Sequence, residues 1–146
     1  IFIAFGGEEE GLLGSKHYVD HGAWPLEKTI AMINLVMVGR LNEDKLTIGG
    51  VGTASQWSEL VKRQNGIIFD SANGYGVGRK FNLQLNEDGF GPSDHSSFYG
   101  KQIPVLFLFT GTHTDYHKPT DTFDKINYEG IGQVVNLEGR VVLLRP

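Results

Sequence analysis

Three consecutive carboxylates, Glu8-Glu9-Glu10, follow a short apolar run and two glycines near the start of the chain. Packing gives no reason to place three acids at the end of a buried strand. Adjacent carboxylates there can divide two chemical tasks, because one can hold a metal ion while its neighbour moves a proton. The alternative is a solvated acidic turn, since carboxylates at a helix start interact favourably with the helix dipole.

A second polar group occupies the segment His113-Thr114-Asp115-Tyr116-His117, and Asp121 follows it closely. Imidazole nitrogens suit zinc, and a nearby carboxylate can orient a ligating ring by hydrogen bonding. Taken alone, this segment could equally be an ordinary polar surface loop. Because Glu8 and Glu9 are expected at the same edge of the sheet, the metal-site hypothesis is favoured over the surface-loop one.

A third group, Asp94 and His95, lies in the first turn of an expected helix, where an acid is favourable in any case. A helix-capping role and an active-site role are compatible at this position. A serine hydrolase is disfavoured, because neither Ser15 nor Ser93 lies in the Gly-x-Ser-x-Gly context of a nucleophile elbow.

Hydrophobic patterns indicate the elements that must position these groups. Long apolar runs are typical of strands buried on both faces, and they occupy residues 1–5, 29–38 and 103–109. Shorter strands are expected at residues 45–48 and 66–69. Helical patterns cover residues 12–21, 55–64, 93–99 and 128–144, with Ser55 and Ser93 as expected N-caps. Residues 71–92 and 110–122 are expected to be loops.

Strands that alternate with helices predict an α/β fold, a three-layer sandwich with a mainly parallel central sheet. The 146 residues fit a single domain. In such sheets ligands bind at the carboxyl ends of the strands. The polar groups follow predicted strands at those ends: Glu8 to Glu10, Gly39-Arg40, and His113 to Asp121.

Composition excludes several classes of function. The net charge of -4 and the scattered basic residues argue against a nucleic-acid or anionic-membrane partner. No apolar stretch approaches the ~20 residues of a transmembrane helix. The absence of cysteine excludes disulfides, thiolate zinc sites and a cysteine nucleophile. The chain begins without Met inside an apolar run, so we expect it to be the C-terminal part of a longer catalytic domain.

Four ordered blocks resemble the co-catalytic di-zinc aminopeptidases, which include bacterial leucyl aminopeptidases and are related to glutaminyl cyclases and the transferrin-receptor ectodomain. The blocks run from Phe5 to Ser15 with Tyr18, from Ile33 to Gly39, from Ser93 to Phe98 with Ile103-Pro104, and from Tyr116 to Thr122 with Asp124 to Asn127. The resemblance implies a zinc-exopeptidase fold whose N-terminal strands are not in this chain.

The resemblance also implies roles for individual residues. Glu8 corresponds to the general base that activates the attacking water. Glu9 and His117 correspond to two ligands of one zinc ion. Three further residues are implied to lie beside the ligands or in the substrate pocket, namely Asp94, Tyr116 and Asp121.

One position departs from the family pattern. Where the family has a zinc-ligating Asp, this chain has Val36, which cannot coordinate a metal. The remaining family ligands, a His and a bridging Asp, lie upstream of the Glu-Glu motif. We therefore expect at most one weak zinc site and no activity of this chain by itself. A buried Val also suits a strand in a protein that binds no metal, so the reason why Val and not Asp stands at position 36 stays open.

Three functions follow from the resemblance. The first is a zinc-dependent aminopeptidase that hydrolyses N-terminal residues from peptides. The second is a catalytically dead relative or binding fragment, and the third is a single-zinc acyltransferase of the glutaminyl cyclase type. The family favours a secreted or periplasmic location, although the 146 residues contain no recognisable signal peptide. The oligomeric state stays open.

Overall fold

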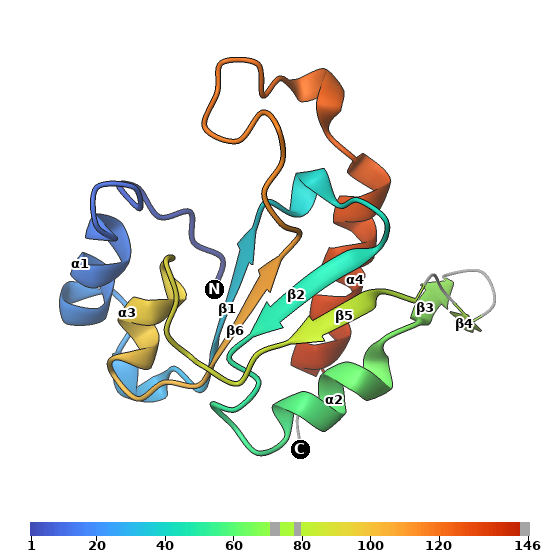
Figure 1. Ribbon diagram of the computed structural model, residues 1–146. Coiled ribbons are helices and arrows are strands. Elements are labelled where there is room, and N and C mark those ends of the chain that lie inside the picture. The colour runs from blue at the N-terminus through green and yellow to red at the C-terminus, as the bar shows by residue number, and fades with distance from the viewer. Residues whose placement is uncertain (71–73, 78–79, 144–146) are drawn as a thin grey trace.

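A computed structural model describes residues 1–70, 74–77 and 80–143 (Figure 1). The main sheet has four strands in the order β1-β6-β2-β5. The pairs β1–β6 and β2–β5 are parallel and the pair β2–β6 is antiparallel, so the predicted mainly parallel sheet is confirmed. The strands are β1 Met32–Val36, β2 Lys45–Gly49, β5 Asn82–Leu85 and β6 Val105–Phe109, and a separate hairpin pairs β3 Ile67–Asp70 with β4 Gly74–Val77.

Helices cover both faces of the main sheet, which confirms the predicted α/β class. Figure 1 shows α1 and α3 together on one side of the sheet and α4 on the other, with α2 beside α4. The bounds are α1 Leu13–His21, α2 Trp57–Gln64, α3 His95–Tyr99 and α4 Tyr128–Leu143, with 3₁₀ turns η1 Leu26–Lys28, η2 Val38–Arg40 and η3 Phe123–Lys125. None of the described helices combines the length and apolar character needed to cross a membrane.

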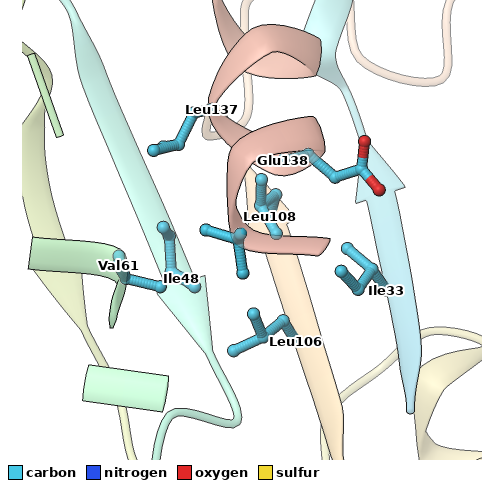
Figure 2. Close-up of a pocket in the computed structure, with 8 residues that line it drawn as sticks. Ile33, Ile48, Val61, Leu106, Leu108, Leu137 and Glu138 are labelled. Atoms are coloured by element: carbon cyan, nitrogen blue, oxygen red, sulfur yellow. The ribbon is translucent and has the colours of Figure 1, made fainter. Parts of the chain in front are cut away.

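The larger hydrophobic core lies between the sheet and the layer of α2 and α4. Alternation along β6 points Leu106 and Leu108 to this face, where they meet Leu137 of α4. Figure 2 shows these side chains around a small apolar cavity, with the Glu138 carboxylate beside β1. Burial raises the pKa of Glu138. Full burial of each large aliphatic side chain stabilises the fold by about 1.5–3 kcal/mol.

The smaller core lies on the opposite face, between the sheet and the layer of α1 and α3. Val105 of β6 packs there with Val19 of α1 and Phe98 of α3. Because β6 contributes buried side chains to both cores, it is the central strand that its continuous apolar run predicted.

Two strand predictions are wrong. Residues 1–5 form no strand in the described chain, and Ile1, Phe2 and Ile3 are exposed. The apolar run 29–38 does contain β1, but β1 lies at an edge of the described sheet, and its Leu35 is partly exposed. Both errors have one cause: apolar composition indicates that a segment can be buried, whereas a central strand also requires a partner on each side.

The predicted loop 71–92 contains β4 and β5, so that prediction is wrong where the structure describes it; residues 71–73 and 78–79 lie outside the described part. The two predicted N-caps are also wrong. Gln56 and Asp94 precede α2 and α3, and neither helix has a side-chain cap bond. The Ser93 hydroxyl instead accepts a hydrogen bond from the Asn34 amide. The other helices and strands lie where the hydrophobic pattern predicted them, with ends that differ by at most two residues.

Candidate functional site

The glutamates lie in a tight turn that leads into α1. The Leu12 amide donates to the Glu8 carbonyl at 2.9 Å, and the Gly14 amide donates to the Gly6 carbonyl at 2.9 Å. A Cβ on Gly14 would lie 2.6 Å from that Gly6 oxygen, so only glycine permits this close approach of α1 to the turn. The turn leaves the Glu9 side chain exposed and the Glu8 side chain half-buried.

Residues of two separate motifs hold this turn against α3. The Ser15 hydroxyl is fully buried and lies 2.9 Å from the Ser97 hydroxyl. The Phe5 ring packs edge-on against Tyr18, and both rings contact Phe98. The first and third blocks of the family pattern therefore form one packed unit that carries the glutamates.

The histidine-containing loop leaves the sheet beside this unit. Since β1 and β6 are parallel, with Val36 opposite Phe109, the segments that follow them emerge side by side. The Thr110 hydroxyl donates to the Met37 carbonyl and joins the two exits. Figure 1 shows the loop after β6 extending beyond the carboxyl ends of both strands. His117 has a left-handed conformation near its tip, with φ of 55°.

The structure brings Glu9 and His117 together. The distance from His117 Nε2 to Glu9 Oε1 is 3.2 Å, and the side chains are 51% and 66% exposed. The Tyr116 ring packs on the His117 ring with centroids 3.9 Å apart, which limits the orientations of the imidazole. The Glu9 carboxylate and the His117 imidazole, 108 positions apart in the sequence, therefore lie in contact at a solvent-accessible position above the sheet.

The other predicted site residues have different surroundings. Asp121 accepts a hydrogen bond from Arg40 and has its second oxygen 3.7 Å from His113 Nε2. Asp94 is buried, and its Oδ1 has no hydrogen-bond partner among the described residues. Val36 ends β1 on the same face as Asn34, because side chains two apart along a strand share a face.

A buried histidine lies beneath this face of the sheet. His95 stacks on Phe107 with centroids 4.4 Å apart, and its Nδ1 lies 3.3 Å from the Asn34 amide nitrogen. Burial lowers the pKa of His95 to about 4, while the carboxylates of Asp94 and Asp88 act in the opposite direction. His95 is therefore a neutral packing residue at physiological pH.

Reasoning from sequence did not predict the network of charged residues at the base of the loop, and it assigned a role there only to Asp121. Arg40 contacts both Asp115 and Asp121, and Asp115 also accepts hydrogen bonds from Thr120 and Lys125. These donors, led by Lys125, hold the pKa of Asp115 well below its usual range. The sequence contained one indication of this network: residues of opposite charge follow β1 and β6, which are neighbouring parallel strands.

The donors available for a metal are few in the described part of the chain. No group of three or more histidine, aspartate or glutamate side chains gathers there in an arrangement that could hold an ion. The Glu9–His117 pair is therefore the candidate site, with two donors.

Several known proteins are similar to this chain. Aminopeptidase YwaD of Bacillus subtilis (strain 168) is 33% identical over 147 residues, which cover 93% of this chain and 30% of that protein. The structure of an aminopeptidase from Aneurinibacillus sp. strain AM-1 has a TM-score of 0.66 at 28% identity, covering 94% of this chain and 31% of its own.

A further solved structure, BSAP, a zinc aminopeptidase from Bacillus subtilis, has a TM-score of 0.69 at 30% identity and covers 95% of this chain and 34% of its own. This chain thus spans about a third of the length of these relatives. The similarity confirms the resemblance that the four sequence blocks indicated. Residues 1–142 match peptidase family M28, and the chain belongs to that family.

Proposed function

We propose that this chain is part of a zinc-dependent aminopeptidase, which hydrolyses the N-terminal residue of peptides. Membership of peptidase family M28 and the similarity to bacterial aminopeptidases support this function. One observation in the structure carries the proposal: Glu9 and His117, which come from distant parts of the sequence, have donor atoms 3.2 Å apart.

This pair fits zinc in both donor type and spacing. Zinc is commonly bound by imidazole nitrogen and carboxylate oxygen, and two tetrahedral ligands each about 2.0–2.1 Å from the metal lie about 3.3 Å apart. The observed 3.2 Å agrees with that separation. Both side chains are exposed, so an ion from solvent can reach them.

In the proposed reaction each residue has a separate task. Glu9 and His117 would hold the zinc, which when bound polarises the scissile carbonyl and favours ionisation of the attacking water. The Glu8 carboxylate would accept a proton from that water and donate it to the leaving amine. Tyr116 would keep the His117 ring in place through the observed packing. Asp94 and Asp121 would lie beside the ligands and substrate.

The number of donors limits what the chain can do by itself. A catalytic zinc site usually has three protein ligands, and the described residues supply two. Val36 occupies the position at which the family pattern has a further ligand. We therefore expect weak zinc binding and no measurable turnover by the 146 residues. The same observations favour a second candidate, a catalytically inactive relative that binds peptides or another partner.

Zinc titration of the purified protein tests the site. Glu9→Gln and His117→Gln should each abolish zinc binding, whereas the neighbouring control Glu10→Gln should leave it unchanged. In a longer form that supplies further donors, Val36→Asp should raise the zinc stoichiometry. Equal zinc binding by the wild type and His117→Gln would contradict the assignment.

Activity on aminoacyl nitroanilides, with detection of free N-terminal amino acids, tests the reaction. Any variant or longer form that turns over should lose roughly 100- to 10,000-fold in kcat on Glu8→Gln, and nothing on Glu10→Gln. An unchanged rate in Glu8→Gln would refute its role as base. No turnover by a zinc-loaded longer form that carries Val36→Asp would favour the inactive relative.

A further inference from the structure

Arg40 bridges two carboxylates of the histidine-containing loop. Its Nη2 donates to Asp115 Oδ2 at 3.0 Å, and its Nη1 donates to Asp121 Oδ1 at 2.9 Å. The Arg40 and Asp115 side chains are only 16% and 15% exposed, in contrast to the exposed Glu9 and His117. Removing one partner of an ion pair that is shielded from water costs more than removing one partner of an exposed pair, because the other charge is left without compensation.

Asp115 is the centre of this arrangement. Its Oδ1 also accepts hydrogen bonds from Thr120 Oγ1 at 2.8 Å and from Lys125 Nζ at 2.7 Å. Lys125 Nζ in addition donates to the Thr120 carbonyl at 2.7 Å. Both limbs of the loop, before and after His117, are therefore joined to one carboxylate and through it to Arg40. We name these five residues the Arg40 cluster: Arg40, Asp115, Thr120, Asp121 and Lys125.

The fold holds Arg40 independently of the loop. Arg40 ends η2, directly after β1, and the neighbouring Gly39 carbonyl accepts a hydrogen bond from the Asn127 amide at 2.8 Å. The Asn127 side chain donates to the Leu41 carbonyl at 2.9 Å. Arg40 is thus attached to the sheet on one side and to the start of α4 on the other, so it is a fixed point for the loop.

We propose that Arg40 is a positioning residue for His117, a role that rests on the proposed function of His117 as a zinc ligand. Through Asp115 and Asp121, Arg40 fixes the two limbs of the loop and thereby holds the His117 ring against Glu9. The left-handed backbone of His117 is unfavourable for a residue with a Cβ and persists only where its surroundings determine it. The Arg40 cluster supplies that restraint.

Geometry and charge make opposite predictions for Arg40, which allows a sharp test. Removal of a cation beside two carboxylates should strengthen the binding of a dication if electrostatic attraction alone matters. Removal of a positioning residue should weaken it, typically by 10- to 100-fold for partners outside the ligand shell. Lysine has a single ammonium group and cannot reproduce the two-pronged contact, so Arg40→Lys should rescue only in part.

The experiment measures zinc dissociation constants of the whole protein by competition with a chromophoric chelator at a fixed neutral pH. The variants are Arg40→Gln, Arg40→Lys and Asp115→Asn, with Lys45→Gln as a control in an exposed ion pair. Amide hydrogen exchange of residues 113–121 is followed without metal, with α4 amides as internal reference. Asp115→Asn approaches the same contact from the loop side if Arg40→Gln does not fold.

Support requires a zinc dissociation constant raised by roughly 10- to 100-fold in Arg40→Gln, a smaller rise in Arg40→Lys, and none in Lys45→Gln. Exchange should accelerate in residues 113–121 and stay unchanged in α4. Unchanged or tighter zinc binding in Arg40→Gln overturns the proposal. If the wild type binds no zinc, the proposed function fails instead. In that case the amide hydrogen-exchange rates test whether Arg40 restrains the loop. Faster exchange of the loop amides in Arg40→Gln supports the restraint, and an unchanged rate overturns it.

Discussion

The buried His95 should make the stability of this protein depend on pH in a defined window. Burial lowers the pKa of His95 to about 4 from its ordinary value of 6.5. Between these values the unfolded chain binds a proton that the folded chain excludes, so the free energy of unfolding falls as the pH falls. The stability contribution is fully present above pH 6.5 and is lost as the pH decreases to about 4.

The size of the effect follows from the two pKa values. Their difference, 6.5 minus 4, corresponds at 1.36 kcal/mol per pH unit to a total loss of about 3 kcal/mol. Most of it, about 2 kcal/mol, should already be lost between pH 7 and pH 5. Carboxylates with lowered pKa values, such as Asp115, lose their contribution only at lower pH, because their ordinary value is 3.8.

Urea unfolding of the wild type and His95→Gln at pH 7 and pH 5 measures this loss. The variant removes the titrating group but keeps a polar partner for Asn34, so its stability should change much less between the two pH values. His95→Phe, which keeps the ring stack on Phe107, replaces it if the glutamine variant does not fold. The raised pKa of Glu138 acts in the opposite direction, but both proteins contain it. The same decrease in both proteins would refute the assignment to His95.

Two further predictions concern stability: one tests backbone packing at glycines and the other tests the hydrogen bonds of Thr53. Gly14→Ala should lower the free energy of unfolding by roughly 1–3 kcal/mol, because the new Cβ would lie 2.6 Å from the Gly6 carbonyl oxygen. Gly139→Ala, at a position on α4 where a Cβ would lie in open space, should instead raise the free energy of unfolding by about 0.5–1 kcal/mol. Chemical denaturation distinguishes them, and effects of the same sign would contradict the close approach of α1 to the turn. Thr53→Val should lower the free energy of unfolding by about 1–3 kcal/mol, because it removes a partly buried hydrogen-bonding hydroxyl. The Thr53 hydroxyl accepts a hydrogen bond from the Val105 amide at 3.0 Å and lies within hydrogen-bonding distance of the Gly50 and Val105 carbonyls. Thr53→Ser keeps the hydroxyl and should cost little, and equal losses in the two Thr53 variants would exclude hydrogen bonding as the cause.

The sequence was most informative where burial decides the structure. The run containing β6 is apolar throughout because its side chains enter both cores, and the spacing of Val134, Leu137 and Val141 follows the face of α4 that meets the sheet. β5 was missed because only two of its four residues, Leu83 and Leu85, are apolar and its surroundings are rich in glycine and asparagine. The strand is defined by its parallel pairing with β2, which is a long-range property.

In the candidate site, too, some features could be predicted from the local sequence and others depend on long-range contacts. His117 was expected near Glu9 because both were predicted to follow parallel strands, and the two side chains do lie together, although residues 1–5, which precede the glutamates, form no strand in the described chain. The contact between Arg40 and Asp115 joins residues 75 positions apart, and local pattern does not reveal such an ion pair. Likewise, Asp121 was expected beside the ligands, and its observed partners are Arg40 and His113.

The two hydrophobic cores lie on opposite faces of one sheet. The segments that carry Glu9 and His117 are held in place by different cores. Glu9 belongs to the turn packed on the smaller core through Phe5, Ser15 and Tyr18. His117 belongs to a loop attached through Arg40 and η2 to the start of α4, in the larger core. An ion held by both side chains would act as a cross-link between the two layers. Its binding free energy would then oppose their separation by thermodynamic linkage, as any ligand specific for the assembled state does.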